Sequence, residues 1–308
     1  MSSKGARSSR VRDLSPRQFA EAVGVSTSSV KRWCDEGHLA TRRTAGGHRR
    51  MPISGVMAFL RARGLDPLRP DLLGLPAGAH RDAGALEAVE ARVQGALRTG
   101  DGETVAATLF GLYLGGRTIA ELADRLLAPA FAVLGQAWER GEVEVYAEHR
   151  AVACCTRALH ELERALPAPP PSAPRALVAT LAGDPYSLPL ELATLALNEV
   201  GFQATSLGPD HPTETLLAAL RTERPRLLAI AVNGVRPGGE PLIATAARLY
   251  AVAREQGTAL VFGGRELDAA SRTAVECTAV CDSMTALVAL AASLGARPRR
   301  ARRPQPIS

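Results

Sequence analysis

The proline-rich tract at residues 167–174 constrains the fold of this 308-residue chain more than any other feature. Its sequence is Pro167-Ala-Pro-Pro-Pro-Ser-Ala-Pro174. Proline has no backbone N–H and a fixed φ angle, so neither a helix interior nor a central strand can pass through this tract. Such a segment forms a stiff, extended spacer. The tract therefore predicts a linker between two parts of the chain that fold separately.

Before the tract, the apolar residues follow a helical period. A Pro/Gly/Asp-rich connector occupies residues 65–84, and it is followed by helical patterns at 86–97, 104–114, 119–138 and 143–166. The breaks between these patterns are short, which makes successive helices antiparallel neighbours. The sequence predicts a four-helix bundle at residues 85–166.

After the tract, short apolar runs alternate with helical patterns. The runs at 176–181, 203–207, 227–232 and 259–262 predict buried strands, and the stretches 190–200, 213–224, 242–256 and 284–294 predict helices. Strands that alternate with helices form a parallel sheet covered on both faces. We therefore expect a Rossmann-like α/β doubly wound parallel sheet at 175–295. The Arg-rich residues 296–308 are predicted to be a disordered tail.

Charge is unevenly distributed along the chain. Residues 1–64 hold thirteen Lys/Arg against four Asp/Glu, and residues 297–308 add five Arg without an acid. The total charge is +6, so the residues between them carry a net charge of −8. A basic end on an acidic body indicates a polyanionic partner for that end.

The basic block at 1–64 has the pattern of two short helices joined by a tight turn. Ser15, Pro16 and Gln18 mark the start of the first helix, Gly24 marks the turn, and Ser26 caps the second helix. The second helix directs short hydroxyls and cations outward: Thr27, Ser28, Lys31 and Arg32. A DNA major groove accepts such a surface.

A hairpin is predicted to follow at residues 41–50, with Gly46-Gly47 as its turn. Cations surround that turn, and they could contact backbone phosphates. They are Arg42, Arg43, His48, Arg49 and Arg50. Together the helices and the hairpin predict a winged helix-turn-helix domain that binds duplex DNA. A winged helix that binds another protein is the competing interpretation.

These motifs resemble the MerR family of winged helix-turn-helix regulators. The resemblance rests on Val23-Gly24-Val25-Ser26, Val30-Lys31-Arg32-Trp33, Gly37-His38-Leu39 and Gly46-Gly47-His48-Arg49-Arg50. We expect a cytoplasmic transcription regulator that acts as a repressor. One winged helix buries little surface, so we also expect a homo-oligomer on an operator with repeated half-sites.

The order of the parts resembles the light-sensing cobalamin repressors of the CarH/LitR class. In that class a Trp, nine residues and then Glu-His mark the bundle that covers the upper face of adenosylcobalamin; here these are Trp138, Glu148 and His149. The class also has Asp-x-His-x-x-Gly after the first strand and a final Gly pair near the nucleotide tail. The matching positions here are Asp184, Tyr186, Pro189 and Gly263-Gly264.

Two departures from this class affect cobalt ligation. Tyr186 stands at the position of the lower His ligand, and Glu139 stands where light-responsive members have a His directly after the Trp. A phenol competes as a ligand only after losing a proton near a pKa of ~10. Cobalamin is therefore a possible cofactor that would lack its His ligand. Either the fold is retained for oligomerisation without a cofactor, or its pocket is retuned to another ligand or to weaker corrinoid binding.

Other classes of protein fit the sequence less well. The five cysteines have neither disulfide nor zinc spacing, and no segment is long and apolar enough for a membrane span. No Ser/His/Asp, Cys/His or paired-carboxylate constellation with catalytic spacing is present, which predicts a protein that is not an enzyme. The alternative function is a corrinoid-carrying subunit of a cobalamin-dependent enzyme.

Overall fold

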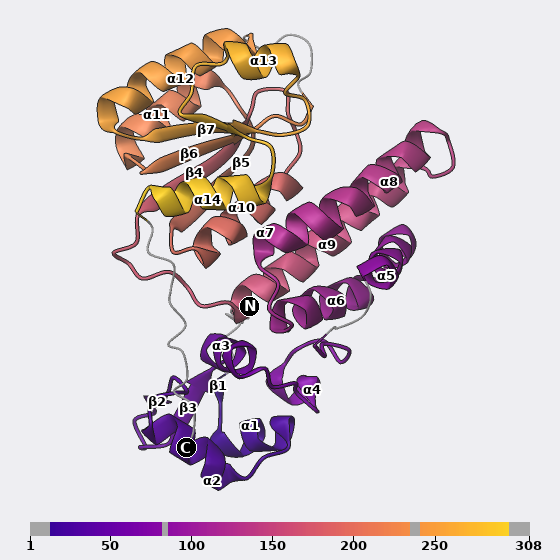
Figure 1. Cartoon of the computed structure of the whole chain (residues 1–308), viewed down its shortest axis with the longest axis vertical. Helices are drawn as coiled ribbons and strands as arrows, with labels where there is room; N and C mark the ends of the chain where they lie inside the picture. The colour runs from indigo at the N-terminus through magenta and orange to yellow at the C-terminus, as the bar shows by residue number, and fades with distance from the viewer. Residues whose placement is uncertain (1–12, 82–85, 235–240, 296–308) are drawn as a thin grey trace, which may run out of the picture.

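A computed structural model of the chain describes residues 13–81, 86–234 and 241–295. Figure 1 shows three parts in chain order: a small N-terminal part, a group of long helices, and a sheet flanked by helices. The predicted tail at 296–308 lies outside the described residues. So do residues 1–12 of the basic block and residues 82–85 at the junction of connector and bundle.

The N-terminal part has the predicted winged helix-turn-helix architecture. Its elements are β1 (Asp13–Leu14), α1 (Pro16–Val23), α2 (Thr27–Asp35), β2 (Arg42–Arg43), β3 (Arg49–Pro52) and α3 (Ile53–Arg63). The three strands form an antiparallel sheet in the order β1-β3-β2. Helix α1 begins where predicted, because Ser15 and Gln18 each accept a hydrogen bond from the other's backbone N–H. Gly24 then turns the chain with a φ of 69°, a conformation that favours glycine.

The connector is partly folded. It contains the short helix α4 (Pro70–Leu73), whose Pro70 and Leu73 are buried. Just before it, the Arg69 N–H donates to the Ala22 carbonyl oxygen at 3.0 Å. The connector therefore runs back along α1 and is packed against the N-terminal part over this stretch.

The middle part is the predicted bundle. It consists of α5 (Leu86–Thr99), α6 (Gly102–Leu114), α7 (Ile119–Leu122), the π-helix η1 (Ala123–Leu127), α8 (Ala128–Glu139) and α9 (Val145–Ala165). The sequence predicts one continuous helix over 119–138, whereas the structure inserts a wide turn within it. Pro129 cannot donate to the carbonyl four residues before it, and the wide turn ends just ahead of it.

The C-terminal part is a five-stranded parallel sheet in the order β5-β4-β6-β7-β8. Its elements are β4 (Arg175–Leu181), α10 (Leu188–Glu199), β5 (Gln203–His211), α11 (Thr213–Glu223), β6 (Leu227–Ala231), α12 (Leu242–Gln256), β7 (Ala259–Gly263), α13 (Ala269–Ala274), β8 (Ala279–Cys281) and α14 (Met284–Ser293). The first four strands were predicted. The fifth has only three residues, too few to show a strand pattern, and α13 was also missed.

Helices cover both faces of this sheet, as a doubly wound fold requires. Residues of α10 and α14 pack on one face, and residues of α11 and α12 pack on the other. The bundle lies against the first of these layers, because α7 contacts both α10 and α14 while α9 contacts α10. Asp124 of η1 fixes the start of α14 by accepting from the N–H groups of Met284 at 2.8 Å and Thr285 at 2.9 Å. Across the described residues, none of the helices has the length and apolar character needed to cross a bilayer.

Candidate functional site

Helix α2 presents the outward face that the sequence predicts. Ser26 caps it by accepting from the Ser29 N–H at 3.1 Å. Val30 is fully buried beneath it, and the Trp33 ring lies 5.0 Å from the Phe59 ring. Ser28, Lys31 and Arg32 are exposed, while Thr27 is half-buried.

The wing forms where Gly46-Gly47 predicts it. Arg42 and Arg43 of β2 pair with Arg50 and Arg49 of β3, and Gly47 turns between them with a φ of 78°. His48 is exposed on the turn, and its carbonyl accepts from the Thr44 N–H at 2.9 Å. The five predicted cations therefore lie on one hairpin.

The wing cations differ in their partners. Arg49 is ion-paired with Asp35 of α2 and also donates to the Lys31 carbonyl at 3.2 Å, so it joins the wing to α2. The hydrogen bond from Arg49 lowers the pKa of Asp35 below its ordinary value. Arg42 is likewise ion-paired, with Asp13 of β1. Two of the predicted phosphate contacts therefore already have carboxylate partners within the domain.

Arg43 and Arg50 have no such partner. Arg43 donates to the Gly47 carbonyl at 3.3 Å, and Arg50 donates to the Arg49 carbonyl at 3.2 Å. Within the described ranges, neither of them, nor Lys31 or Arg32, forms an ion pair with a carboxylate. Among the predicted arginines and lysine, these four are without a carboxylate ion pair in the part of the chain that the structure describes, although Arg43 also contributes to the lowered pKa of Asp35.

At the other end of the molecule, Asp184 follows β4 and is fully buried. One carboxylate oxygen accepts from the Tyr186 N–H at 3.1 Å, and the other accepts from the Asn233 N–H at 2.6 Å. Burial raises the pKa of this carboxyl above its ordinary value, against the opposing effect of those hydrogen bonds. Asp184 therefore joins the loop after β4 to the loop after β6, and both of its oxygens are occupied by backbone.

Tyr186 is more than one-third exposed, at 38%, and lies across neighbouring backbone. A Cβ built on Gly234 would stand 2.6 Å from its ring, and the Arg265 guanidinium lies 5.4 Å from the ring centroid. Arg265 in turn donates to the Asn233 carbonyl at 3.3 Å. The phenol ring is thus held between Gly234 and Arg265.

The Gly263-Gly264 pair is required by the protein's own backbone. Gly264 has a φ of 117°, and a Cβ there would stand 2.2 Å from the Val232 carbonyl oxygen. A Cβ on Gly263 would stand 2.9 Å from the Cys281 carbonyl oxygen. The resemblance implies that this pair makes room for a nucleotide tail, but the close contacts with the Val232 and Cys281 carbonyls already require glycine at both positions.

Asn233 was not among the predicted site residues. Its side-chain nitrogen is buried and has no hydrogen-bond partner. An unpaired buried amide costs free energy unless a ligand or water satisfies it. Its position just after β6, at the carboxyl edge of a parallel sheet, is the signal that could have identified it.

The three predicted residues of the bundle lie near one end of α8 and α9. Trp138 is 45% exposed next to the end of α8, and the neighbouring Tyr146 is 66% exposed. On α9, Glu148 is half-buried and His149 is exposed. Figure 1 shows this end of the bundle projecting away from the helices that contact the sheet. In the described part of the chain, no cluster of His, Cys, Asp and Glu could hold a metal ion.

Two protein-family profiles match parts of the chain. The profile described as helix-turn-helix domain matches residues 14–64, and the profile described as B12 binding domain matches residues 89–163. The first match covers the winged helix, and the second covers the bundle. No curated protein matches the chain as a whole.

Solved structures share the architecture of the bundle and sheet. The monomethylamine corrinoid protein of Methanosarcina barkeri is 14% identical and has a TM-score of 0.52, with 68% of this chain and 100% of that chain covered. A cobalamin-binding protein of Desulfitobacterium hafniense is 15% identical, with a TM-score of 0.36 and coverages of 67% and 98%. The likeness to the monomethylamine corrinoid protein is one of fold. The chain thus joins a region that matches the helix-turn-helix profile to a region that matches the B12 binding profile, followed by a parallel α/β sheet.

Proposed function

We propose that this protein is a sequence-specific DNA-binding transcription regulator. The exposed face of α2 carries the proposal. Ser28, Lys31 and Arg32 project from this helix into solvent, and neither cation is paired with a carboxylate in the described residues. A helix of this kind fits the major groove of DNA. The helix-turn-helix match supports it. Figure 1 adds that α3 lies toward the bundle while α2 lies at the far end, so the body does not cover the reading helix.

Helix α2, which would contact the bases, and the wing have separate roles in this proposal. Ser28 and Lys31 contact base edges in the major groove, whereas Arg43 and Arg50 contact phosphates. Arg42, Arg49 and His48 hold or extend the wing. This division follows from the ion pairs of Arg42 and Arg49, whose carboxylate partners reduce what those two cations can give to DNA.

Selection from a random duplex pool tests the proposal. The full chain is expected to enrich one motif with two or more half-sites, because a single winged helix buries little surface and an oligomer multiplies the contacts. Enrichment of no motif would contradict DNA specificity. A strict monomer in light scattering, with and without the selected duplex, would contradict the oligomer.

We further propose a MerR-type mode of action, with repression as the outcome, on the motifs of the wing and of α2. A reporter gene that carries the selected motif across its promoter tests whether the protein represses or activates transcription. Lower expression with the intact chain and recovery with Lys31→Ala are expected. Activation would overturn the repressor assignment while leaving DNA binding in place.

The bundle and the sheet, which together form the effector half, do not fit a cobalt ion that is ligated from below by a histidine. Residues 182–189 contain no histidine, and both oxygens of Asp184 already accept hydrogen bonds from backbone N–H groups. The Gly263-Gly264 pair is required by backbone contacts within the protein, so it is not evidence for a nucleotide tail. We propose that this half serves mainly as the assembly body of the regulator, and that any corrinoid is bound weakly and without a protein imidazole.

The competing function is a corrinoid-carrying enzyme subunit. The B12 binding match and the unpaired Asn233 amide favour it, and the helix-turn-helix domain disfavours it. Visible absorbance after incubation with adenosylcobalamin and gel filtration, measured beside the duplex selection, separates the two. Stoichiometric retention of corrinoid bands by a chain that enriches no DNA motif would favour the carrier. Loss of the bands would contradict the carrier.

A further inference from the structure

One arginine connects the DNA-binding part to both other parts of the molecule. Arg61 lies in the last turn of α3, and its guanidinium contacts Glu199 at 3.3 Å, the Gly116 carbonyl at 3.1 Å and the Tyr113 ring at 4.1 Å. Tyr113 and Gly116 belong to the end of α6 and the turn after it, and Glu199 ends α10. The three parts therefore meet at a single guanidinium.

Glu199 completes this junction from the side of the sheet. Its second carboxylate oxygen accepts from the Ile119 N–H at 2.7 Å, at the first residue of α7. The Arg61 and Glu199 side chains are only 23% and 16% exposed. Both charges are thus withdrawn from water and paired with each other. Removal of one partner would leave the other charge buried and uncompensated.

Helix α10 places this junction at a fixed distance from the edge of the sheet. The helix begins at Leu188, two residues after Tyr186, and ends at Glu199. Its 12 residues span roughly 18 Å at about 1.5 Å per residue. One rigid element therefore joins the loop held by Asp184 to the side chain that holds the winged helix.

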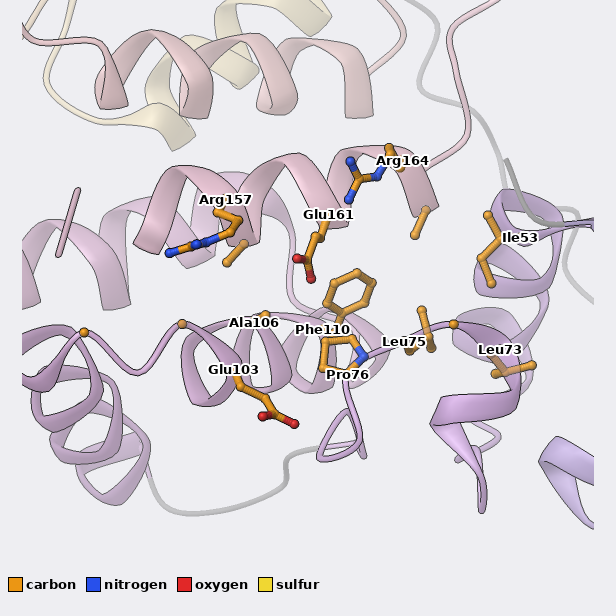
Figure 2. A pocket seen from close by; sticks show the side chains of 15 residues that line it. Ile53, Leu73, Leu75, Pro76, Glu103, Ala106, Phe110, Arg157, Glu161 and Arg164 are labelled. Atoms are coloured by element: carbon orange, nitrogen blue, oxygen red, sulfur yellow. The ribbon is translucent and has the colours of Figure 1, made fainter. Parts of the chain in front are cut away.

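A hollow borders the start of α3, beside its packed contacts with α6 and α9. A cavity of about 870 Å³ lies between α6, α9, the connector and the start of α3 (Figure 2). Ile53, at the first position of α3, lines it together with Leu75 of the connector and Phe110 of α6. The charged side chains around it in Figure 2 are Glu103, Arg157, Glu161 and Arg164. Helix α3 is therefore bonded to the body at its Arg61 end, and its buried Ile53 end borders this cavity.

We propose that the Arg61–Glu199 pair is an interdomain clamp, and that α10 transmits movement of the sheet-edge loop to the winged helix through it. While the pair is intact, α3 keeps one orientation relative to the body. When α10 shifts or the pair breaks, the winged helix turns about the junction into the space of the cavity. The clamp requires no assumption about DNA or corrinoid, so it can fail or hold independently of the proposed function.

Hydrogen exchange on the full chain, without DNA, tests the clamp. Arg61→Ala and Glu199→Gln are each expected to speed exchange of the amides of α3 and of residues 116–122 by about tenfold or more, which is what one charged hydrogen bond typically contributes to an opening equilibrium. The double variant should exchange more slowly than the product of the two single effects predicts, because the Arg61–Glu199 bond is lost in both single variants. Amides of α2 and the wing should not change.

Arg63→Ala is the matched control. It removes the same charge from the same helix, but the Arg63 guanidinium lies 5.4 Å from the Phe59 ring within the winged helix itself. Exchange in residues 116–122 that is unchanged in Arg61→Ala, or raised equally in Arg63→Ala, would overturn the clamp. Additive effects in the double variant would overturn the pairing.

A second measurement tests transmission through α10. Tyr186→Ala loosens the loop ahead of α10 and is expected to speed exchange in α3 in the otherwise unmodified chain. The same substitution should add nothing in the Glu199→Gln background, where the connection is already cut. An equal effect in both backgrounds, or no effect on α3 in either, would overturn transmission and leave the clamp as a static contact.

Discussion

Individual residues on this chain were easier to identify than their roles. The sequence correctly indicated that cations gather on the wing, because Gly46-Gly47 fixes a hairpin and every neighbouring position is visible in the sequence. It could not indicate that Asp35 and Asp13 pair with Arg49 and Arg42, since each pair is brought together by tertiary structure. The same limit applies to Asp184, whose position was predicted but whose backbone partner at Asn233 lies 49 residues away.

The salt dependence of DNA binding follows from this difference between the wing cations. Arg43→Ala and Arg50→Ala are expected to reduce the slope of log affinity against log salt by about 0.9 for each lost phosphate contact. Arg42→Ala should reduce the slope by less, because its charge is shared with Asp13. Anisotropy titrations at several salt concentrations measure the slopes. Equal slopes for all three variants and the unmodified chain would contradict the assignment.

A close backbone contact determines which side chains the protein tolerates at position 264. Gly264→Ala is expected to destabilise the protein by about 2–3 kcal/mol, because the new Cβ collides with the Val232 carbonyl and the φ angle is unfavourable for alanine. Gly135→Ala in α8 is the control, since its Cβ meets nothing within 4 Å and alanine favours helix by about 0.5–1 kcal/mol. Urea unfolding compares the two. A neutral effect at residue 264 would show that the strands can move apart.

At the scale of elements, periodicity predicted the long helices and the four buried strands. Hydrophobic periodicity failed as a predictor where local chemistry, such as a proline or a very short strand, determines the structure. The pattern over 119–138 is continuous in hydrophobicity, yet Pro129 limits hydrogen bonding within it and a π-helix results. It also failed for β8, whose three residues pair with β7 although no alternation is visible at that length. The connector looked like a spacer because of its prolines, but Pro70 starts a short helix instead.

The start of α7 makes stability depend on pH. Glu121 accepts from the Thr118 N–H at 2.9 Å in a capping box, and this hydrogen bond lowers its pKa below the ordinary value of 4.5. A carboxyl with a lowered folded-state pKa stabilises the fold above its unfolded pKa and loses that contribution as pH falls through the folded value. Glu121→Gln should therefore be less stable than the unmodified chain at pH 7. The difference should disappear in thermal unfolding scans well below pH 4.5, and a difference independent of pH would contradict this.

At the scale of the whole molecule, the order of the parts was predicted, but their contacts were not. Nothing in the sequence around Arg61 or Glu199 distinguishes them from surface residues, because 138 positions separate them and each lies near a helix end. The resemblance to cobalamin repressors gave the order of the parts. It did not give the packing of α7 on α10 and α14, which depends on side chains that meet only in the folded chain.

The corrinoid expectation is testable on the whole chain. Tyr186→His with Pro189→Gly restores the two family residues, but Asp184 remains bonded to the backbone of residues 186 and 233. We expect the unmodified chain to retain little adenosylcobalamin after gel filtration, and the double variant to gain only a small amount. Illumination should leave operator affinity unchanged. Tight binding by the unmodified chain, with operator release in light, would contradict this account.

The ratio of affinities for a selected duplex and a scrambled duplex tests the central claim most directly. Anisotropy titrations at one salt concentration would compare the full chain with Lys31→Ala and with Arg221→Ala, which removes an exposed cation from α11. The unmodified chain is expected to prefer the selected duplex by roughly a thousandfold or more. Lys31→Ala should lower that preference by about five- to a hundredfold, as the loss of a base contact does, and Arg221→Ala should leave it unchanged. Equal affinity for both duplexes, or a preference that survives Lys31→Ala intact, would contradict a regulator that reads DNA with α2.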